Sequence, residues 1–125
     1  MPGPIDIQSS EWMELVESEE RPVMVEYWHH KCVACKQMKP IYEAQPELFG
    51  NETKFIRMNL LESKENRKFA IRGGVRSTPT FILYCQGRPV GQIIGSRRTD
   101  DFTDEIRALV DNAENCLMAT PLEEE

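Results

Sequence analysis

Residues 23–36 read VMVEYWHHKCVACK, and this stretch decides the fold class. The compact apolar run from Val23 to Trp28 predicts a strand that is buried on both faces. A helix is expected from about Cys32 to Ala44, so Cys32 and Cys35 fall where a strand ends and a helix begins. The first-turn amides and the dipole of that helix favour an anion, and we therefore expect a lowered pKa for Cys32.

The rest of the chain alternates between strand and helix patterns. Strands are expected at residues 5–7, 54–59, 80–85 and 89–94, and helices at residues 9–18 and 63–71 and from Thr99 onward. Only the turn Gln86-Gly87 separates the last two strands, which must therefore be antiparallel. Pro40 lies inside the helix that carries the cysteines and is expected to kink it. The order β-α-β-α-β-α-β-β-α predicts an α/β fold, with a mixed central β-sheet flanked by helices on both faces.

Length and charge limit the class of protein. The 125 residues fit a single domain, assigned to residues 1–119, followed by a flexible acidic tail at residues 120–125. The 15 Lys and Arg residues against 21 Asp and Glu residues give a formal charge of −6. This balance argues against nucleic acid as a partner, because phosphate binding needs a basic stripe.

The sequence contains neither a membrane segment nor a secretory signal. The longest apolar run, residues 81–85, is far shorter than the ~20 residues that a membrane span needs. Residues 1–6 lack the basic and apolar regions of a secretory signal. We therefore expect a cytoplasmic protein that has no membrane partner.

The grouping of the four cysteines indicates redox chemistry. Cys32 and Cys35 form a Cys-x-x-Cys motif, whereas Cys85 and Cys116 stand apart. Four cysteines in 125 residues are too few for a disulfide scaffold, and a structural zinc site would need a second close pair. We therefore expect no metal and no cofactor. Cys85 and Cys116 are expected to be small packed thiols, with a regulatory disulfide as the alternative.

Further segments complete a family pattern. The order and spacing of several segments resemble the thioredoxin family over about residues 5 to 115. These segments are the strand at residues 23–28, the motif CVACK at 32–36, Pro40, the segment STPTF at 77–81, Gly87 and Gly95. The string CVACK is similar to that in the C-terminal thioredoxin-like domain of the membrane disulfide reductase DsbD. The resemblance implies a thioredoxin fold in which Pro79 is cis and faces the cysteine pair. It also implies that Cys32 is the attacking nucleophile and Cys35 the resolving thiol.

Glu26 is a carboxylate in the middle of an apolar strand, where a charge is costly unless it is paired or used. One interpretation is an ordinary ion pair with Lys54 or Arg57 on the neighbouring strand. The other is a buried acid beneath the cysteines, matching the buried acid of the family. Burial would raise the pKa of Glu26 and let it take a proton from Cys35 near neutral pH.

The resemblance also implies a set of substrate-binding residues. A cis Pro79 leaves the backbone of Thr78 free to pair with a substrate strand, and Gly95 matches a further position of the family pattern. Lys31 stands where the family usually has a tryptophan. We expect Lys31 to face acidic partner surfaces, with a merely solvated side chain as the alternative.

Basic residues next to the pair are expected to tune its acidity. Lys36 adds positive potential, and a protonated His30 or His29 near Cys32 would stabilise its thiolate. The alternative for the two histidines is a solvated loop position.

These features predict a thiol–disulfide oxidoreductase that reduces protein disulfides through the Cys32/Cys35 dithiol and a mixed-disulfide intermediate. Its expected partners are disulfide-bearing proteins and an upstream electron donor such as a thioredoxin-reductase-like enzyme, and its expected state is a monomer. Two alternatives remain open, namely a non-catalytic thioredoxin-fold binding module and a glutaredoxin-like, glutathione-dependent enzyme.

Overall fold

The computed structural model describes residues 3–118, with side chains as far as Ala113. The Cys116 side chain and the acidic tail at 120–125 lie outside this description, so the expectations for them stay predictions, as does the domain boundary at residue 119. Between residues 3 and 118, no helix is both long and apolar enough to cross a membrane.

Five strands form one mixed sheet in the order β1-β3-β2-β4-β5. The strands are β1 (Ile5–Asp6), β2 (Val23–Trp28), β3 (Lys54–Asn59), β4 (Thr80–Cys85) and β5 (Arg88–Ile94). β1 and β2 both run parallel to β3, whereas β4 is antiparallel to β2 and β5 is antiparallel to β4. The predicted mixed sheet and its antiparallel hairpin are confirmed, and β5 begins one residue earlier than expected.

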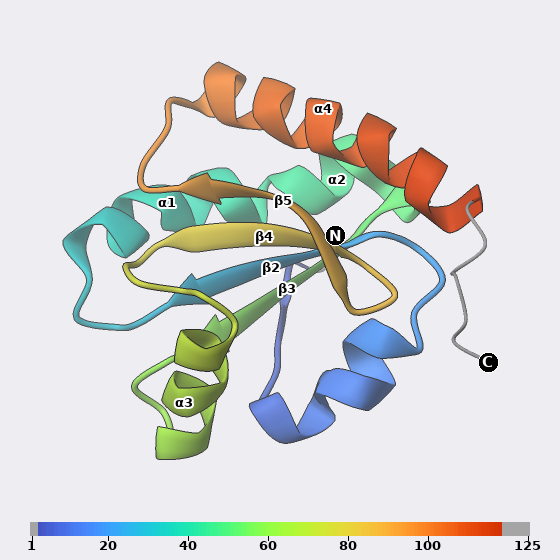
Figure 1. The fold of residues 1–125 in the computed structure, drawn as a ribbon. Coiled ribbons are helices and arrows are strands. Elements are labelled where there is room, and N and C mark those ends of the chain that lie inside the picture. The colour runs from blue at the N-terminus through green and yellow to red at the C-terminus, as the bar shows by residue number, and fades with distance from the viewer. Residues whose placement is uncertain (1–2, 119–125) are drawn as a thin grey trace, which may run out of the picture.

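Helices cover both faces of the sheet, as Figure 1 shows. α1 (Val33–Glu43), α2 (Gln45–Phe49) and α4 (Thr99–Met118) lie along one face. α3 (Lys64–Arg72) and the short helices η1 (Ser9–Glu11) and η2 (Met13–Glu17) lie on the other, and a single turn, η3 (Gly50–Glu52), leads into β3. This arrangement is the thioredoxin fold that the sequence predicts.

The side chains of β2 alternate between the two halves of the core. Val25 packs in the same buried cluster as Ala70 of α3, whereas Met24 packs with Tyr42 of α1. Because successive side chains of a strand point to opposite faces, Glu26 lies on the same side as Met24. The carboxylate is therefore placed under the helix that carries the cysteine pair.

The first helical segment differs from the regular helix expected at residues 9–18. It consists of the 3-10 turn η1 and the π-helical turn η2, which meet at Trp12. The Trp12 ring lies 4.7 Å from the ring of Phe69 and 4.8 Å from that of Tyr84, measured between centroids. We attribute the irregular winding to this packing, since the contacts of a large ring override local helix preference.

The helix that carries the cysteines ends next to Ala44, as expected, and a short second helix follows it directly. The kink expected at Pro40 stays a prediction. α1 continues through Pro40 and ends at Glu43, and α2 starts with Pro46 in its first turn. Pro46 has no amide hydrogen for the preceding turn and restricts the residue before it, which explains the break. The buried Gln45 side chain donates to the carbonyl oxygen of Ile41 at 3.0 Å across the break.

Asn66, a buried residue in the first turn of α3, ties three segments together. Its Oδ1 accepts a hydrogen bond from the Ser9 amide at 2.8 Å, and its Nδ2 donates to Gln8 Oε1 at 3.0 Å and to the Asn59 carbonyl at 3.1 Å. The Asn66 amide in turn donates to Ser63 Oγ, the N-cap of α3, at 3.0 Å. The side chain therefore fixes η1 and the end of β3 against α3.

Replacing this side chain is expected to destabilise the fold. Asn66→Ala leaves the Ser9 amide and the Asn59 carbonyl with fewer partners in a buried place, so we expect a loss of roughly 2–4 kcal/mol in the free energy of unfolding. Urea unfolding followed by circular dichroism measures it. Asn112→Ala, at an exposed position of α4, is the control, and an equal effect in both variants would contradict the assigned role.

Candidate functional site

Cys32 stands at the start of the helix that carries the pair. It is the N-cap residue of α1, and the Cys35 amide donates a hydrogen bond to its Sγ at 3.1 Å. A sulfur in this position also meets the positive end of the helix dipole. Both interactions favour its thiolate over its thiol.

The two cysteines are joined in a disulfide, with Cα atoms 5.2 Å apart. The structure therefore represents the oxidised state of the pair. Cys32 is 9% exposed and Cys35 is 2% exposed, so solvent reaches the first sulfur more easily. Val33, between them, has a well-exposed side chain.

The loop before β4 lies against the first cysteine. The Thr78-Pro79 peptide bond is cis, as predicted, and the Thr78 carbonyl oxygen lies 3.5 Å from Cys32 Sγ. The Gly95 amide donates to the Pro79 carbonyl at 2.9 Å and joins this loop to the end of β5. Gly95 has a φ of +87°, a conformation that favours glycine. Three of the predicted substrate-binding residues are thus brought together, and one of them, Thr78, lies against Cys32.

Glu26 combines features of both interpretations drawn from the sequence. It is fully buried, and Arg57 Nε donates to its Oε1 at 2.8 Å. Burial raises the pKa of Glu26 to about 7, with Arg57 opposing the shift and Asp6 and Glu43 adding to it. Glu26 Oε2 has no hydrogen-bond partner among the described residues. The ion pair is real, yet it does not compensate for the loss of water around the carboxylate.

A small pocket lies beside Arg57 and the second cysteine. Its volume is about 240 Å³, and it is lined by Trp28, His30, Cys35, Lys36, Lys39 and Arg57. The Arg57 guanidinium lies 4.1 Å from the centroid of the Trp28 ring, so the aromatic face and Glu26 together hold it in place. Arg57 therefore touches both the carboxylate and the space next to Cys35.

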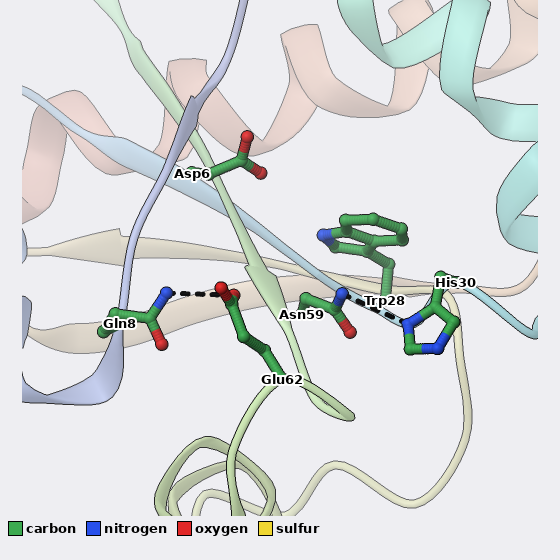
Figure 2. Close-up of a pocket in the computed structure, with 6 residues that line it drawn as sticks. All are labelled: Asp6, Gln8, Trp28, His30, Asn59 and Glu62. Atoms are coloured by element: carbon green, nitrogen blue, oxygen red, sulfur yellow. Dashed lines mark hydrogen bonds between the residues drawn. The ribbon is translucent and has the colours of Figure 1, made fainter.

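The remaining predicted residues lie on the loop between β2 and α1 or in its vicinity. Lys31 is exposed, and its amide donates to His29 Nδ1 at 3.2 Å. Asn59 Nδ2 lies 3.4 Å from His30 Nδ1, which places the His30 ring toward β3 (Figure 2). Lys36 is exposed and lines the pocket of Cys35. The roles assigned to these side chains stay predictions.

Sequence reasoning missed a second pocket, which shares Trp28 and His30 with the first. Its volume is about 380 Å³, and Figure 2 shows the six residues that line it, namely Asp6, Gln8, Trp28, His30, Asn59 and Glu62. Gln8 Nε2 donates to Glu62 Oε2 at 2.9 Å. These residues come from β1, β2, β3 and the adjoining loops, so no motif in the sequence could have brought them together.

Within the described part of the chain, no three His, Cys, Asp or Glu side chains group closely enough to hold a metal ion. Cys85 is fully buried at the end of β4, as expected for a packed thiol.

The raised pKa of Glu26 predicts a stability that depends on pH. Between pH 4.5 and about 7 the folded protein keeps a proton that the unfolded chain has released, so the free energy of unfolding falls as the pH rises through this window. Glu26→Gln cannot ionise and should lack this fall. We expect it to be more stable than the unmodified protein at about pH 8, by roughly 1–3 kcal/mol.

Urea unfolding at about pH 5 and about pH 8 tests this expectation. The exposed Glu20→Gln variant serves as the control and should follow the unmodified protein. Parallel pH profiles for Glu26→Gln and the unmodified protein would contradict a proton held on Glu26.

Comparison with known proteins agrees with this geometry. The family model described as Thioredoxin matches residues 3–108. Thioredoxin M4, chloroplastic, of Arabidopsis thaliana is 34% identical over 91 residues, which cover 73% of this chain and 46% of the relative. Thioredoxin of Alicyclobacillus acidocaldarius subsp. acidocaldarius is 34% identical over 61% of this chain and 70% of its own length, and Thioredoxin of Rickettsia prowazekii (strain Madrid E) is 32% identical over 74% and 85%.

The match spans about half the length of the M-type plant relatives. The match to the family model nevertheless covers most of this chain, and Cys32 and Cys35 lie at disulfide distance within it. The chain therefore belongs to the thioredoxin family.

Proposed function

We propose that this chain reduces disulfide bonds in other proteins through the Cys32/Cys35 dithiol. The observation that carries the proposal is the position of Cys32 Sγ. At the N-cap of α1, this sulfur accepts a hydrogen bond from the Cys35 amide and lies beside the Thr78 carbonyl oxygen. It is also bonded to the sulfur of Cys35. One sulfur is thus favoured as a thiolate, and the other lies close enough to attack it and displace a substrate sulfur bound to it.

In the first step, the Cys32 thiolate attacks one sulfur of a substrate disulfide. A bond forms between Cys32 and that sulfur, the substrate bond breaks, and the other substrate sulfur leaves as a thiolate that takes a proton from solvent. The substrate segment pairs with the backbone of Thr78, next to Pro79 and Gly95. Backbone pairing of this kind accepts many different sequences.

In the second step, Cys35 attacks Cys32 Sγ and releases the second substrate thiolate. The Cys35 thiol must first lose its proton, and we assign Glu26 as the acceptor, because a pKa of about 7 matches proton transfer near neutral pH. Arg57 holds the carboxylate and lines the pocket of Cys35. The substrate gains two electrons, and the chain ends in the oxidised state seen in the structure.

Each cycle requires the Cys32–Cys35 disulfide to be reduced again. We propose an upstream dithiol donor, such as a thioredoxin-reductase-like enzyme, and a reducing compartment such as the cytoplasm. The chain is proposed to act as a monomer, with each copy carrying both sulfurs.

The direction of electron flow follows from the residues that flank the sulfurs. A strong disulfide donor needs a very stable reduced form, which a side-chain hydrogen-bond donor between the cysteines would supply. Val33 and Ala34 carry no such donor. A carboxylate at Glu26 opposes a second negative charge nearby. We therefore assign the pair to the reducing side of the disulfide exchange range.

The potential of the pair is expected to be roughly −250 mV or below. Equilibration with glutathione redox buffers, followed by alkylation and mass spectrometry, measures it. A value above about −180 mV, in the range of disulfide isomerases, would show a protein built to donate disulfides.

Catalysis is expected to depend on both sulfurs in different ways. The intact dithiol should reduce insulin disulfides with dithiothreitol as donor, and neither single-cysteine variant should do so catalytically. Cys35→Ser should accumulate a mixed disulfide between Cys32 and the substrate, because no second thiol displaces the substrate sulfur. Cys32→Ser should trap little substrate.

Non-reducing gel electrophoresis and peptide mapping detect the trapped species. Cys85→Ser, a change at a buried position outside the pair, is the control and should keep the reductase activity if it folds. Trapping through Cys35 in place of Cys32 would overturn the assignment of roles, and a folded dithiol without activity would favour a binding module.

A further inference from the structure

The pocket beside Cys35 is lined by an excess of positive charge. Lys36, Lys39 and Arg57 line it together with His30, and no carboxylate is among its lining residues. Lys36 and Lys39 are exposed, and neither makes an ion pair with another described residue. Two cations therefore face this pocket without an anion to balance them.

The two pockets that share Trp28 and His30 differ in the charge of their other lining residues. Both residues line the cationic pocket and also the second pocket, in which the carboxylates of Asp6 and Glu62 lie on the side of β1 and the loop after β3 (Figure 2). An anion approaching the cysteine pair would be repelled on the Asp6 side and attracted on the side of Lys36 and Lys39.

We propose that the pocket lined by Lys36, Lys39 and Cys35 binds the carboxylate of an Asp or Glu residue that lies near the disulfide of the substrate. This inference rests on the proposed function and adds a preference among its substrates. The chain would then reduce disulfides next to acidic residues faster than otherwise identical disulfides without them.

The size and place of the pocket fit a single side chain. At about 240 Å³ it is smaller than the usual 300–1,000 Å³ of a pocket for a whole small molecule. Cys35 lines it, and the Cα atoms of the two cysteines are only 5.2 Å apart. An extended chain advances about 3.3 Å per residue, so a side chain one to three positions from the attacked cysteine can reach the pocket.

The preference should be modest and sensitive to salt. Ion pairs between partly exposed groups are weak one at a time, and two cations acting together give an expected factor of about three to ten in kcat/KM at low ionic strength. Salt screens such pairs over about 10 Å at 0.1 M and about 3 Å at 1 M. The factor should therefore shrink toward one at about 1 M salt.

Two peptides with one intramolecular disulfide and a fluorescence readout test the proposal. They differ only in Glu or Gln two positions from one cysteine. The unmodified chain should reduce the Glu peptide about three to ten times faster at low salt. Equal rates on both peptides would overturn the inference and leave the proposed function intact, whereas reduction of neither would remove the proposed function and the inference with it.

Substitutions assign the preference to this pocket. Lys39→Gln should weaken it, and Lys39→Glu should reverse it, so that the Gln peptide becomes the better substrate; a purely structural role would not change its sign. Lys68→Gln, on α3 at the other face of the sheet, is the matched control and should keep the original preference. A preference that survives Lys39→Glu but disappears in Lys31→Gln would place recognition on the loop and overturn the pocket.

Discussion

The contact between Glu26 and Arg57 is the constraint on which the surroundings of the cysteine pair depend. The parallel register of β2 and β3 places these two residues directly opposite each other, and both side chains lie inside the protein. One carboxylate oxygen of Glu26 accepts a hydrogen bond from the Arg57 guanidinium, while the other has no hydrogen-bond partner among the described residues. The fold thus keeps an acid whose charged form is poorly stabilised, as is common where proteins use an acid in chemistry.

This contact also organises the space next to Cys35. The guanidinium that binds Glu26 lies on the Trp28 ring, and Trp28 lines both pockets. Trp28 Nε1 has no hydrogen-bond partner among the described residues, so the ring is held by packing and by the cation alone. A change at Arg57 would therefore disturb the acid, the ring and the cationic pocket together.

The sequence predicted the parts of the fold and site that depend on local signals. The order of elements followed from periodicity and turns, and the family pattern identified Cys32, Cys35 and a cis Pro79. The partner of Glu26 remained undecided between Lys54 and Arg57, because only strand register distinguishes them. In the structure Lys54 lies opposite Val23 and reaches the Leu15 carbonyl and Glu19 instead. Asn66 was missed because a buried polar residue in a polar helix looks like a surface residue in the sequence.

The overall charge of the chain differs from the charge around the site. A formal charge of −6 argues against nucleic acid, yet the pocket at Cys35 is lined by cations, since folding separates acids from bases around Trp28 and His30. The backbone pairing proposed at Thr78 does not distinguish side chains, so we expect discrimination between disulfides to come from groups such as these. Lysines that attract an acidic substrate are also expected to favour the thiolate of Cys32. We therefore expect recognition and reactivity to be coupled through the same electrostatic field, so that a change in one alters the other.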